Sequence, residues 1–174
     1  MNHTSATTTA SSNHPHLQSI SDRSKLGFIL TLVLFLIALL LPALEAGTPN
    51  SAPGISMTGW RSAHVVGSYL FGFLEDSFDF KKDFVDWFYY SAFNVTNLAL
   101  LGLPILSFTK RFGQFSSLLP WFVGACFLHA ASWWFCEKQQ ILAGYYVWRL
   151  AVGVLFAACL ARVRSLKTAS KTAH

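Results

Sequence analysis

Polar side chains that could bind a ligand occur inside the long apolar runs of this sequence. Asn94 and Asn97 are three residues apart and therefore share one face of a predicted helix. His129 and Arg149 lie in two later apolar runs. Amide and imidazole groups form hydrogen bonds, and a guanidinium group binds carboxylate or phosphate. These residues predict a polar cluster, which a bound anion such as a lipid phosphate or a small acid would complete.

Two aromatic residues would cover this polar site on one side. Trp133 follows His129 by one helical turn, and Tyr145 precedes Arg149 by one turn. Both rings would therefore lie on the outer side of the polar groups. The candidate ligand-binding residues are Arg149, His129, Asn97, Asn94, Tyr145 and Trp133.

Distances along the predicted helices place these polar groups at one depth in a membrane. His129 and Arg149 flank the turn at residues 137–140, and each is about 15 Å from it at about 1.5 Å per residue. An arginine at the centre of a membrane helix costs about 2.5–3.5 kcal/mol. No Asp or Glu occurs in the apolar runs. Arg149 therefore needs another partner: Asn97, His129, a carbonyl near Pro104, a carboxylate from the outer loop, the ring of Tyr145 or Tyr146, or a bound anion.

Three roles fit such a cluster: a structural contact between helices, a ligand or transport site, and an active site. Asn and His commonly hydrogen-bond across membrane helices, which favours the structural role. The sequence has no H-E-x-x-H, no G-x-S-x-G and no paired carboxylates in its apolar runs. It has one histidine in these runs, whereas a haem held between helices usually needs two. We therefore expect no enzyme activity, no cofactor and no metal site.

The elements that must position these residues are membrane helices. The chain is 53% hydrophobic and 12% charged, about half the charged share of a typical soluble protein. Its apolar runs occupy residues 26–44, 87–108, 117–136 and 141–161. Each run is close to the roughly 20 residues that a helix needs to cross a bilayer. The sequence predicts an all-α protein with a four-transmembrane-helix bundle at residues 25–163.

The basic residues predict the orientation of this bundle. Arg23 and Lys25 precede the first run, Lys110 and Arg111 separate the second from the third, and a further basic group follows the fourth. With four spans, all of these residues lie on one side, which is cytoplasmic by the positive-inside rule. We expect a multi-pass plasma-membrane protein with both termini in the cytoplasm. The basic residues form no basic face, so we expect no binding of nucleic acid.

The composition of both ends of the chain predicts tails outside the membrane. Residues 1–24 are rich in Ser, Thr, His and Asn and predict a disordered cytoplasmic tail. Residues 164–174 predict a basic cytoplasmic tail. The first run has a basic flank like that of a signal peptide. Its length and the lack of a clean cleavage site favour a retained helix.

The first outer loop, residues 45–86, divides into a flexible part and an ordered part. Gly, Pro, Asn and Ser over residues 47–54 predict turns. Apolar residues recur at helical spacing over residues 56–74, but this stretch is too short to span a membrane. It predicts a short interfacial or capping helix. The next helix would begin near a cap at Asp76 or Ser77.

Four short motifs stand out in the sequence: LPALEAG after the first run, PGISMTGW in the outer loop, FNVTNLALL in the second run and AGYYVWRLAVG in the fourth. Together they resemble motifs of small bacterial four-span integral membrane proteins, a group without an established activity. The resemblance covers most of residues 26–161 and implies topology alone. The chain lacks the C-x-x-C of four-span thiol oxidoreductases.

These patterns favour a non-enzymatic structural or accessory component of the membrane. Its partners would be the lipid bilayer and a larger membrane complex, or an anionic lipid or small acid. The alternative is a binder or transporter of a small molecule, anion or lipid. In that alternative, the polar site lies at mid-membrane between the second, third and fourth helices.

Overall fold

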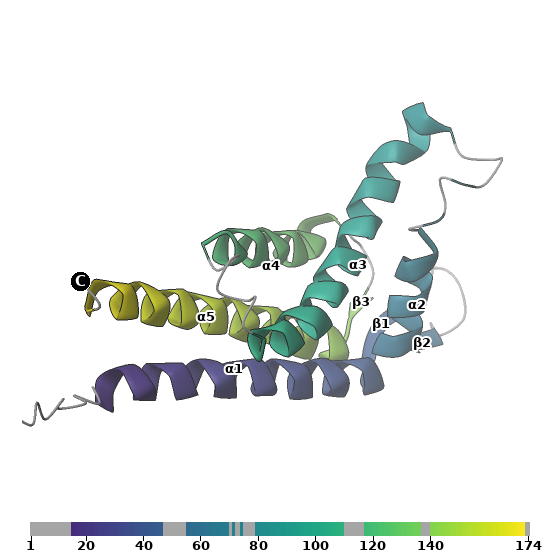
Figure 1. Cartoon of the computed structure of the whole chain (residues 1–174). Helices are drawn as coiled ribbons and strands as arrows, with labels where there is room; N and C mark the ends of the chain where they lie inside the picture. Colours follow the sequence, from purple (N-terminus) through teal and green to yellow (C-terminus); the bar gives the residue numbers. More distant parts are fainter. Residues whose placement is uncertain are drawn as a thin grey trace, which may run out of the picture.

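The computed structural model describes residues 15–46, 55–69, 71, 74, 79–109, 117–136 and 140–172. In chain order, the elements are α1 Pro15–Leu40, β1 Pro42–Ala46, β2 Ile55–Thr58, α2 Gly59–Tyr69, α3 Phe80–Ser107, α4 Leu119–Cys136, β3 Gln140–Ile141 and α5 Ala143–Thr172. The chain is mostly helical, as predicted, and Figure 1 shows the arrangement of its helices.

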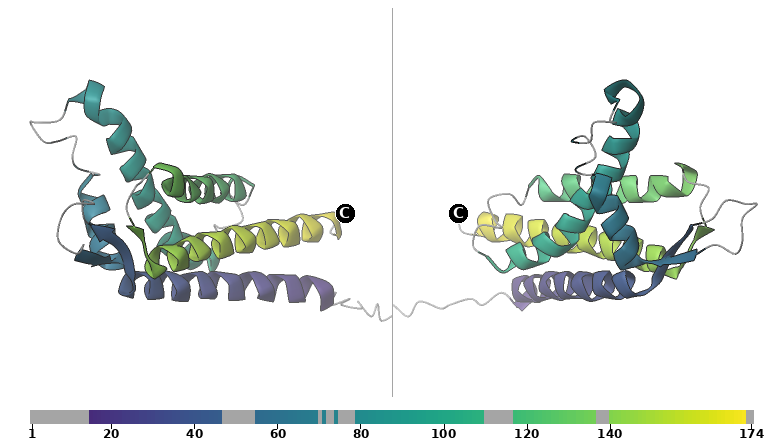
Figure 2. Two further views of the ribbon diagram at one scale, coloured as in Figure 1. Left: turned by 180° about the vertical axis from the view of Figure 1, so that it is seen from behind. Right: turned by 90° about the vertical axis from the view of Figure 1, so that its right-hand side faces the viewer.

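The longest interface joins α1 and α5, which run antiparallel side by side (Figure 1 and Figure 2). Small side chains let the two backbones approach closely. A Cβ added at Gly27 of α1 would lie only 2.9 Å from the Cβ of Ala158 on α5. Thr31 is fully buried, and its hydroxyl donates a 2.9 Å hydrogen bond to the carbonyl oxygen of Gly27. Small residues at such contacts are typical of membrane helices.

The main hydrophobic core lies where α1, α3, α4 and α5 meet. Each helix contributes a side chain with almost no exposed surface: Phe28, Leu100, Val123 and Leu155 in that order. α4 packs along α5, whereas α3 crosses the bundle obliquely (Figure 1 and Figure 2). The N-terminal part of α3 extends away from the other long helices, so its surface there is open on most sides.

A small antiparallel sheet that the sequence did not predict lies at the end of α1, within a fold that is mostly helical. Helix α1 ends at Leu40 because Pro42 lacks an N–H group and disfavours helical geometry in the preceding residue. The strand order is β2-β1-β3, and Glu45 of β1 pairs with Ser56 and Gln140. Residues 42–44, expected to end the first span, and residues 45–46, expected to begin the outer loop, therefore form the central strand of this sheet.

The first and last helices extend into the two predicted tails. Helix α1 begins at Pro15, so residues 15–24 are helical, and residues 1–14 lie outside the described residues. Proline suits a first helical position because its missing N–H would have no intrahelical partner there. Helix α5 continues to Thr172, so residues 164–172 extend that helix.

The loop between α1 and α3 contains the predicted short helix, α2. Helix α3 begins at Phe80, and Asp79 is its N-cap. The Asp79 carboxylate accepts a hydrogen bond from the Lys81 N–H at 3.0 Å, and the Asp79 N–H donates to Asp83 Oδ2 at 2.8 Å. The predicted caps at residues 76 and 77 and the predicted turn at 47–54 lie outside the described residues.

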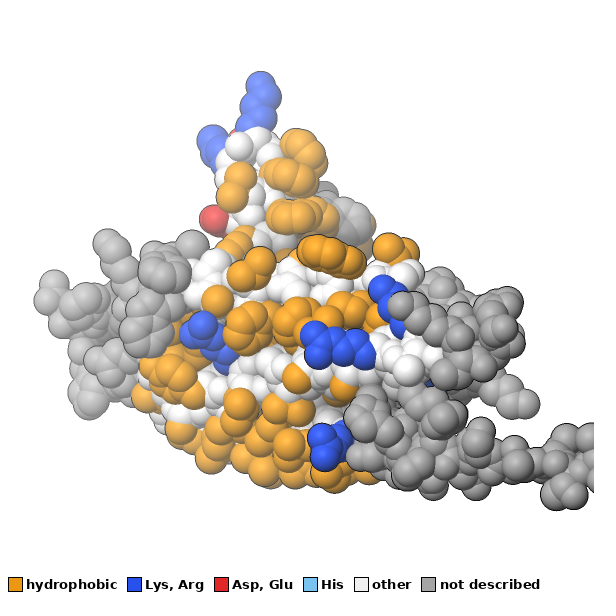
Figure 3. All heavy atoms as spheres, turned by 90° about the vertical axis from the view of Figure 1, so that its left-hand side faces the viewer, with side chains coloured by type: hydrophobic (Ala, Val, Ile, Leu, Met, Phe, Trp, Pro, Cys, Tyr) orange, Lys and Arg blue, Asp and Glu red, His pale blue; other side chains and the backbone are white. Residues whose placement is uncertain are grey.

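Two helices of the described chain are long and apolar enough to cross a membrane, at Arg23–Leu40 and Ala143–Thr168. Only 28% of each segment is buried inside the protein. On α1, Leu26 is 66% exposed, Leu36 55% and Leu40 80%. Figure 3 shows hydrophobic side chains across the lower face, where α1 lies. A helix on the surface of a water-soluble protein would normally place polar residues on this side.

Candidate binding cavity

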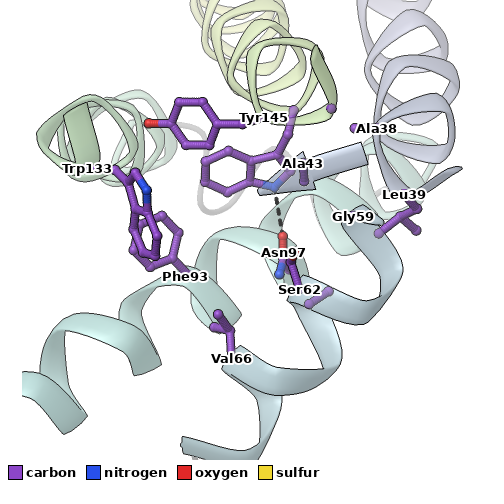
Figure 4. Close-up of a pocket in the computed structure, with 13 residues that line it drawn as sticks. Ala38, Leu39, Ala43, Gly59, Ser62, Val66, Phe93, Asn97, Trp133 and Tyr145 are labelled. Atoms are coloured by element: carbon purple, nitrogen blue, oxygen red, sulfur yellow. Dashed lines mark hydrogen bonds between the residues drawn. The ribbon is translucent and has the colours of Figure 1, made fainter. Parts of the chain in front are cut away.

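A cavity lies at the end of the bundle where all five helices and β1 converge. Its volume is about 80 Å³, and it is open on one side. Apolar and aromatic side chains form most of its wall, and Figure 4 shows how they lie. The lining residues are Ala38, Leu39, Ala43, Gly59, Ser62, Ala63, Val66, Phe93, Asn97, Trp133, Gly144, Tyr145 and Trp148.

Aromatic rings from α3, α4 and α5 meet at this cavity. The ring centroids of Phe93 and Trp133 are 4.9 Å apart, and their planes are nearly perpendicular. Trp148 lies 5.6 Å from Phe93 and 5.9 Å from Tyr145, again between ring centroids. These are favourable separations for aromatic pairs. The walls are therefore flat ring faces from three helices, which suit a flat or apolar ligand.

Asn97 is held in place by the ring of a neighbouring helix. Trp148 Nε1 donates a 2.8 Å hydrogen bond to Asn97 Oδ1 (Figure 4). The amide oxygen accepts this bond through one of its two lone pairs, and the amide nitrogen of Asn97 carries two N–H donors.

Two further polar groups of the cavity wall have no hydrogen-bond partner within the described part of the chain. They are the indole N–H of Trp133, a residue only 5% exposed, and the buried hydroxyl of Ser62. Leaving a buried donor unsatisfied costs about 1–3 kcal/mol. A bound acceptor atom would recover part of this cost. The wall thus combines apolar rings with a few hydrogen-bond donors.

Tyr145 lines the cavity with its ring, but its polar end is engaged elsewhere. Its hydroxyl donates to the carbonyl oxygen of Ala130 on α4. This bond ties the start of α5 to α4, and the residue is only 6% exposed. Tyr145 therefore contributes a ring face, and its hydroxyl is already used in packing two helices together.

Asn94 faces the capping helix and does not line the cavity. Its side-chain amide donates a 2.8 Å hydrogen bond to the carbonyl oxygen of Val66 on α2, and the residue is 7% exposed. The bond attaches α2 to α3. This contact supports the structural role that the sequence allowed for an asparagine in this position.

His129 packs beside the cavity, among aromatic rings of α3. Its ring centroid lies 4.8 Å from that of Tyr89 and 4.4 Å from that of Phe93. Both imidazole nitrogens are buried, and neither has a hydrogen-bond partner among the residues described. The ring contacts hold the imidazole in place and leave its hydrogen-bonding capacity unused.

Arg149 lies apart from the cavity, on another side of α5. Its guanidinium carbon is 5.8 Å from the centroid of the Phe127 ring on α4, a cation–π distance. No ion pair to Arg149 occurs within the described ranges. The ring found over this arginine is thus that of Phe127, a residue that was not among the partners considered from the sequence.

The predicted cluster is therefore divided. Three of its residues, Asn97, Trp133 and Tyr145, line one cavity, while Asn94, His129 and Arg149 make separate contacts. Sequence reasoning missed Trp148 and Ser62. A signal existed for Trp148, because it follows Tyr145 by three residues and so shares its helix face. No comparable signal identified Ser62, which reaches the cavity from the capping helix.

Other site chemistry is limited in the part of the chain that the structure describes. No group of three or more His, Cys, Asp or Glu residues there could hold a metal ion. Cys126 and Cys159 are free and buried.

Comparisons with known proteins returned no match: no protein-family model, no curated protein and no solved structure is similar enough to the chain.

Proposed function

We propose that this chain is an integral membrane protein whose helices α1, α3, α4 and α5 cross the plasma membrane, with both termini in the cytoplasm. Its role in this proposal is non-enzymatic, as a structural or accessory component of the bilayer. The observation that carries the proposal is the outward face of α1. Leu26, Ile29, Val33 and Leu36 are each more than two-fifths exposed, and all are apolar.

An exposed apolar helix face has a clear physical meaning. Burial of apolar surface yields about 25 cal/mol per Å², and a water-soluble chain loses this gain wherever such a face meets water. In a bilayer the same face contacts lipid acyl chains, so this free energy is not lost. The opposite face, which packs against other helices, can consist of small residues. Gly27 and Ala158 provide this kind of seam between α1 and α5.

Exposed aromatic residues also support an assembly role within this proposal. On the N-terminal part of α3, Phe80 is 66% exposed, Val85 71% and Phe88 62%. Asp79 and Lys82 of the same region form a 3.5 Å ion pair on the surface. A mixed surface of aromatic and charged groups suits the membrane interface or contact with another membrane protein. A larger membrane complex therefore remains our proposed partner.

A second candidate function is the binding of a small molecule or lipid. The observation that favours it is the cavity, where Trp133 and Ser62 offer buried donors that no described residue satisfies. The alternative predicted from the sequence placed this site around Arg149. Because Asn97, Trp133 and Tyr145 line the cavity, we now propose these three as the binding residues.

A charge substitution on α1 tests the membrane proposal. Val33 is 46% exposed, so Val33→Lys in a water-soluble protein changes stability by less than about 0.5 kcal/mol. At mid-membrane the same lysine costs about 2.5–3.5 kcal/mol. The matched control is Leu26→Lys, near the predicted cytoplasmic end, where a lysine can reach the headgroups. We expect Val33→Lys alone to reduce recovery of folded protein in the membrane fraction.

Membrane extraction completes this test. The parent protein should stay in the membrane fraction after washing at alkaline pH and should require detergent for release. A parent protein that is soluble without detergent, or a Val33→Lys variant that behaves like Leu26→Lys, would overturn the proposal.

A further inference from the structure

We infer that the cavity between the five helices binds the carbonyl group of an uncharged, mostly apolar membrane molecule. This inference rests on the proposed membrane function, because such ligands are supplied from the bilayer. Two kinds of molecule share the required chemistry: a quinone-type ring and the ester carbonyl of a lipid acyl chain.

The polar groups of the wall select an acceptor. Trp133 offers an N–H that has no partner in the described structure, and an indole nitrogen can only donate. Asn97 already accepts a bond from Trp148 through its oxygen, and its amide nitrogen carries two N–H donors. Ser62 offers a buried hydroxyl, which can donate. A ligand atom that satisfies these groups must accept hydrogen bonds.

The absence of charge in the wall selects a neutral ligand. None of the described residues that line the cavity is an Asp, Glu, Lys, Arg or His. An ionised phosphate or carboxylate would lose its hydration there without gaining an opposite charge, at a cost of several kcal/mol. Arg149, the cation expected to attract an anion, lies instead against Phe127. The cavity therefore suits a carbonyl oxygen better than the anion expected from the sequence.

The walls and the size of the cavity determine what kind of group can carry the ligand's carbonyl. The rings of Phe93, Trp133 and Trp148 present faces and edges that pack against a flat ring or a hydrocarbon chain. A volume of about 80 Å³ is smaller than the roughly 150 Å³ of an apolar cavity that encloses benzene. The cavity thus takes the carbonyl end of a ligand whose remainder lies in the open mouth.

Water is a weaker occupant for this site. A water could meet the polar groups of Trp133, Asn97 and Ser62, but it would bury none of the rings and aliphatic groups that form most of the wall. Figure 4 shows Trp133 beside Phe93 on one side, with Asn97 and Ser62 on another. A ligand that fills the space between these sides satisfies donors on both while burying apolar surface.

The test uses the full chain, purified from membranes and reconstituted in nanodiscs of ether-linked phosphatidylcholine, which lacks ester carbonyls. One arm adds duroquinone, whose fully methylated ring resists addition of cysteine thiols. The other arm compares nanodiscs of ester-linked phosphatidylcholine with the same acyl chain length. The readouts are the melting temperature and the tryptophan fluorescence. We expect at least one arm to raise the melting temperature, because a ligand that binds only the folded state stabilises it.

Variants then locate the binding site. Trp133→Phe keeps a ring but removes the N–H, and Ser62→Ala removes the hydroxyl. Each substitution should therefore lower the affinity for the probe that stabilises the parent by about three- to tenfold. Ala63→Leu narrows the cavity and should abolish the effect. The matched controls are Trp121→Phe, at an 81% exposed position outside the cavity, and Ala157→Leu on the exposed side of α5. Both should bind like the parent.

The outcomes separate this inference from the membrane proposal. If the parent is not recovered in membranes, the proposed function fails first. If it is recovered and folded but neither probe stabilises it, the cavity holds water only and the inference is overturned. Equal stabilisation of the parent and Ala63→Leu also overturns it. Should Trp133→Phe fail to fold, Ser62→Ala supplies the same comparison.

Discussion

Gly27→Ala is the sharpest single test of how α1 and α5 pack. The added Cβ would lie 2.9 Å from the Cβ of Ala158, whereas carbon atoms in good contact are at least about 3.5 Å apart. The helices must therefore separate locally by about 0.6 Å. Overpacking of this kind costs about 1–3 kcal/mol, while replacing a mid-helix glycine by alanine gains up to about 1 kcal/mol. We expect Gly27→Ala to lower the unfolding free energy by about 0–3 kcal/mol.

A double-mutant cycle isolates the contact from these helix propensities. Ala158→Gly alone should be destabilising, because it removes a buried methyl group and a good helix former. The pair Gly27→Ala with Ala158→Gly restores the space between the helices. We expect a favourable coupling of about 1–3 kcal/mol in the double variant. Unfolding in mixed detergent micelles, followed by tryptophan fluorescence, provides all four free energies.

Gly102→Ala on α3 is the matched control for this cycle. A Cβ there meets nothing within 4 Å, so only the gain in helix propensity of up to about 1 kcal/mol remains. The packing argument is refuted if Gly27→Ala stabilises the protein as much as Gly102→Ala does, or if the coupling energy is zero.

Three further substitutions test other contacts by the same unfolding measurement. A Cβ at Gly59 would overlap the carbonyl oxygen of Ala38, so Gly59→Ala should cost about 1–3 kcal/mol or more; a variant as stable as the parent would show that α2 is not seated against α1. Asn94→Ala removes the bond to the Val66 carbonyl, which should cost about 1–3 kcal/mol and speed hydrogen exchange in α2; unchanged exchange would contradict this contact. Arg149→Leu loses a cation–π contact of about 0.5–2 kcal/mol but avoids an insertion cost of about 2.5–3.5 kcal/mol, so it should fold and be at least as stable as the parent. Unfolding of this last variant would mean that Arg149 has a stronger partner than the Phe127 ring.

The positions of the helices could be predicted from the sequence, because hydrophobic runs near 20 residues identify long apolar helices directly. The short capping helix was also predicted from helical spacing in the outer loop. The small sheet was not, because β1 follows Pro42 inside an apolar run and pairs with segments far along the chain. Such non-local backbone pairing leaves little trace in local composition.

The candidate site could be predicted only in part, because depth along a helix does not fix the direction of a side chain. Asn97, Trp133 and Tyr145 line one cavity. Trp148 takes the place that Arg149 was expected to fill, since these neighbouring residues point about 100° apart on a helix. The Asn94 side chain points to α2 because the Val66 carbonyl oxygen accepts its hydrogen bond. The depth of Asn94 along its helix could not predict this partner, because the partner lies on a different element.

The number of spans is the central claim, and residue 113 tests it most directly. In a variant with its native cysteines replaced by alanine, Gly113→Cys lies between α3 and α4, and Asn50→Cys lies in the loop after α1. Both are treated in intact cells with a membrane-impermeant maleimide. A four-span protein predicts labelling at residue 50, and at residue 113 only after permeabilisation. Labelling of residue 113 in intact cells would contradict four spans, because α1 and α5 would then cross the membrane without α3 and α4.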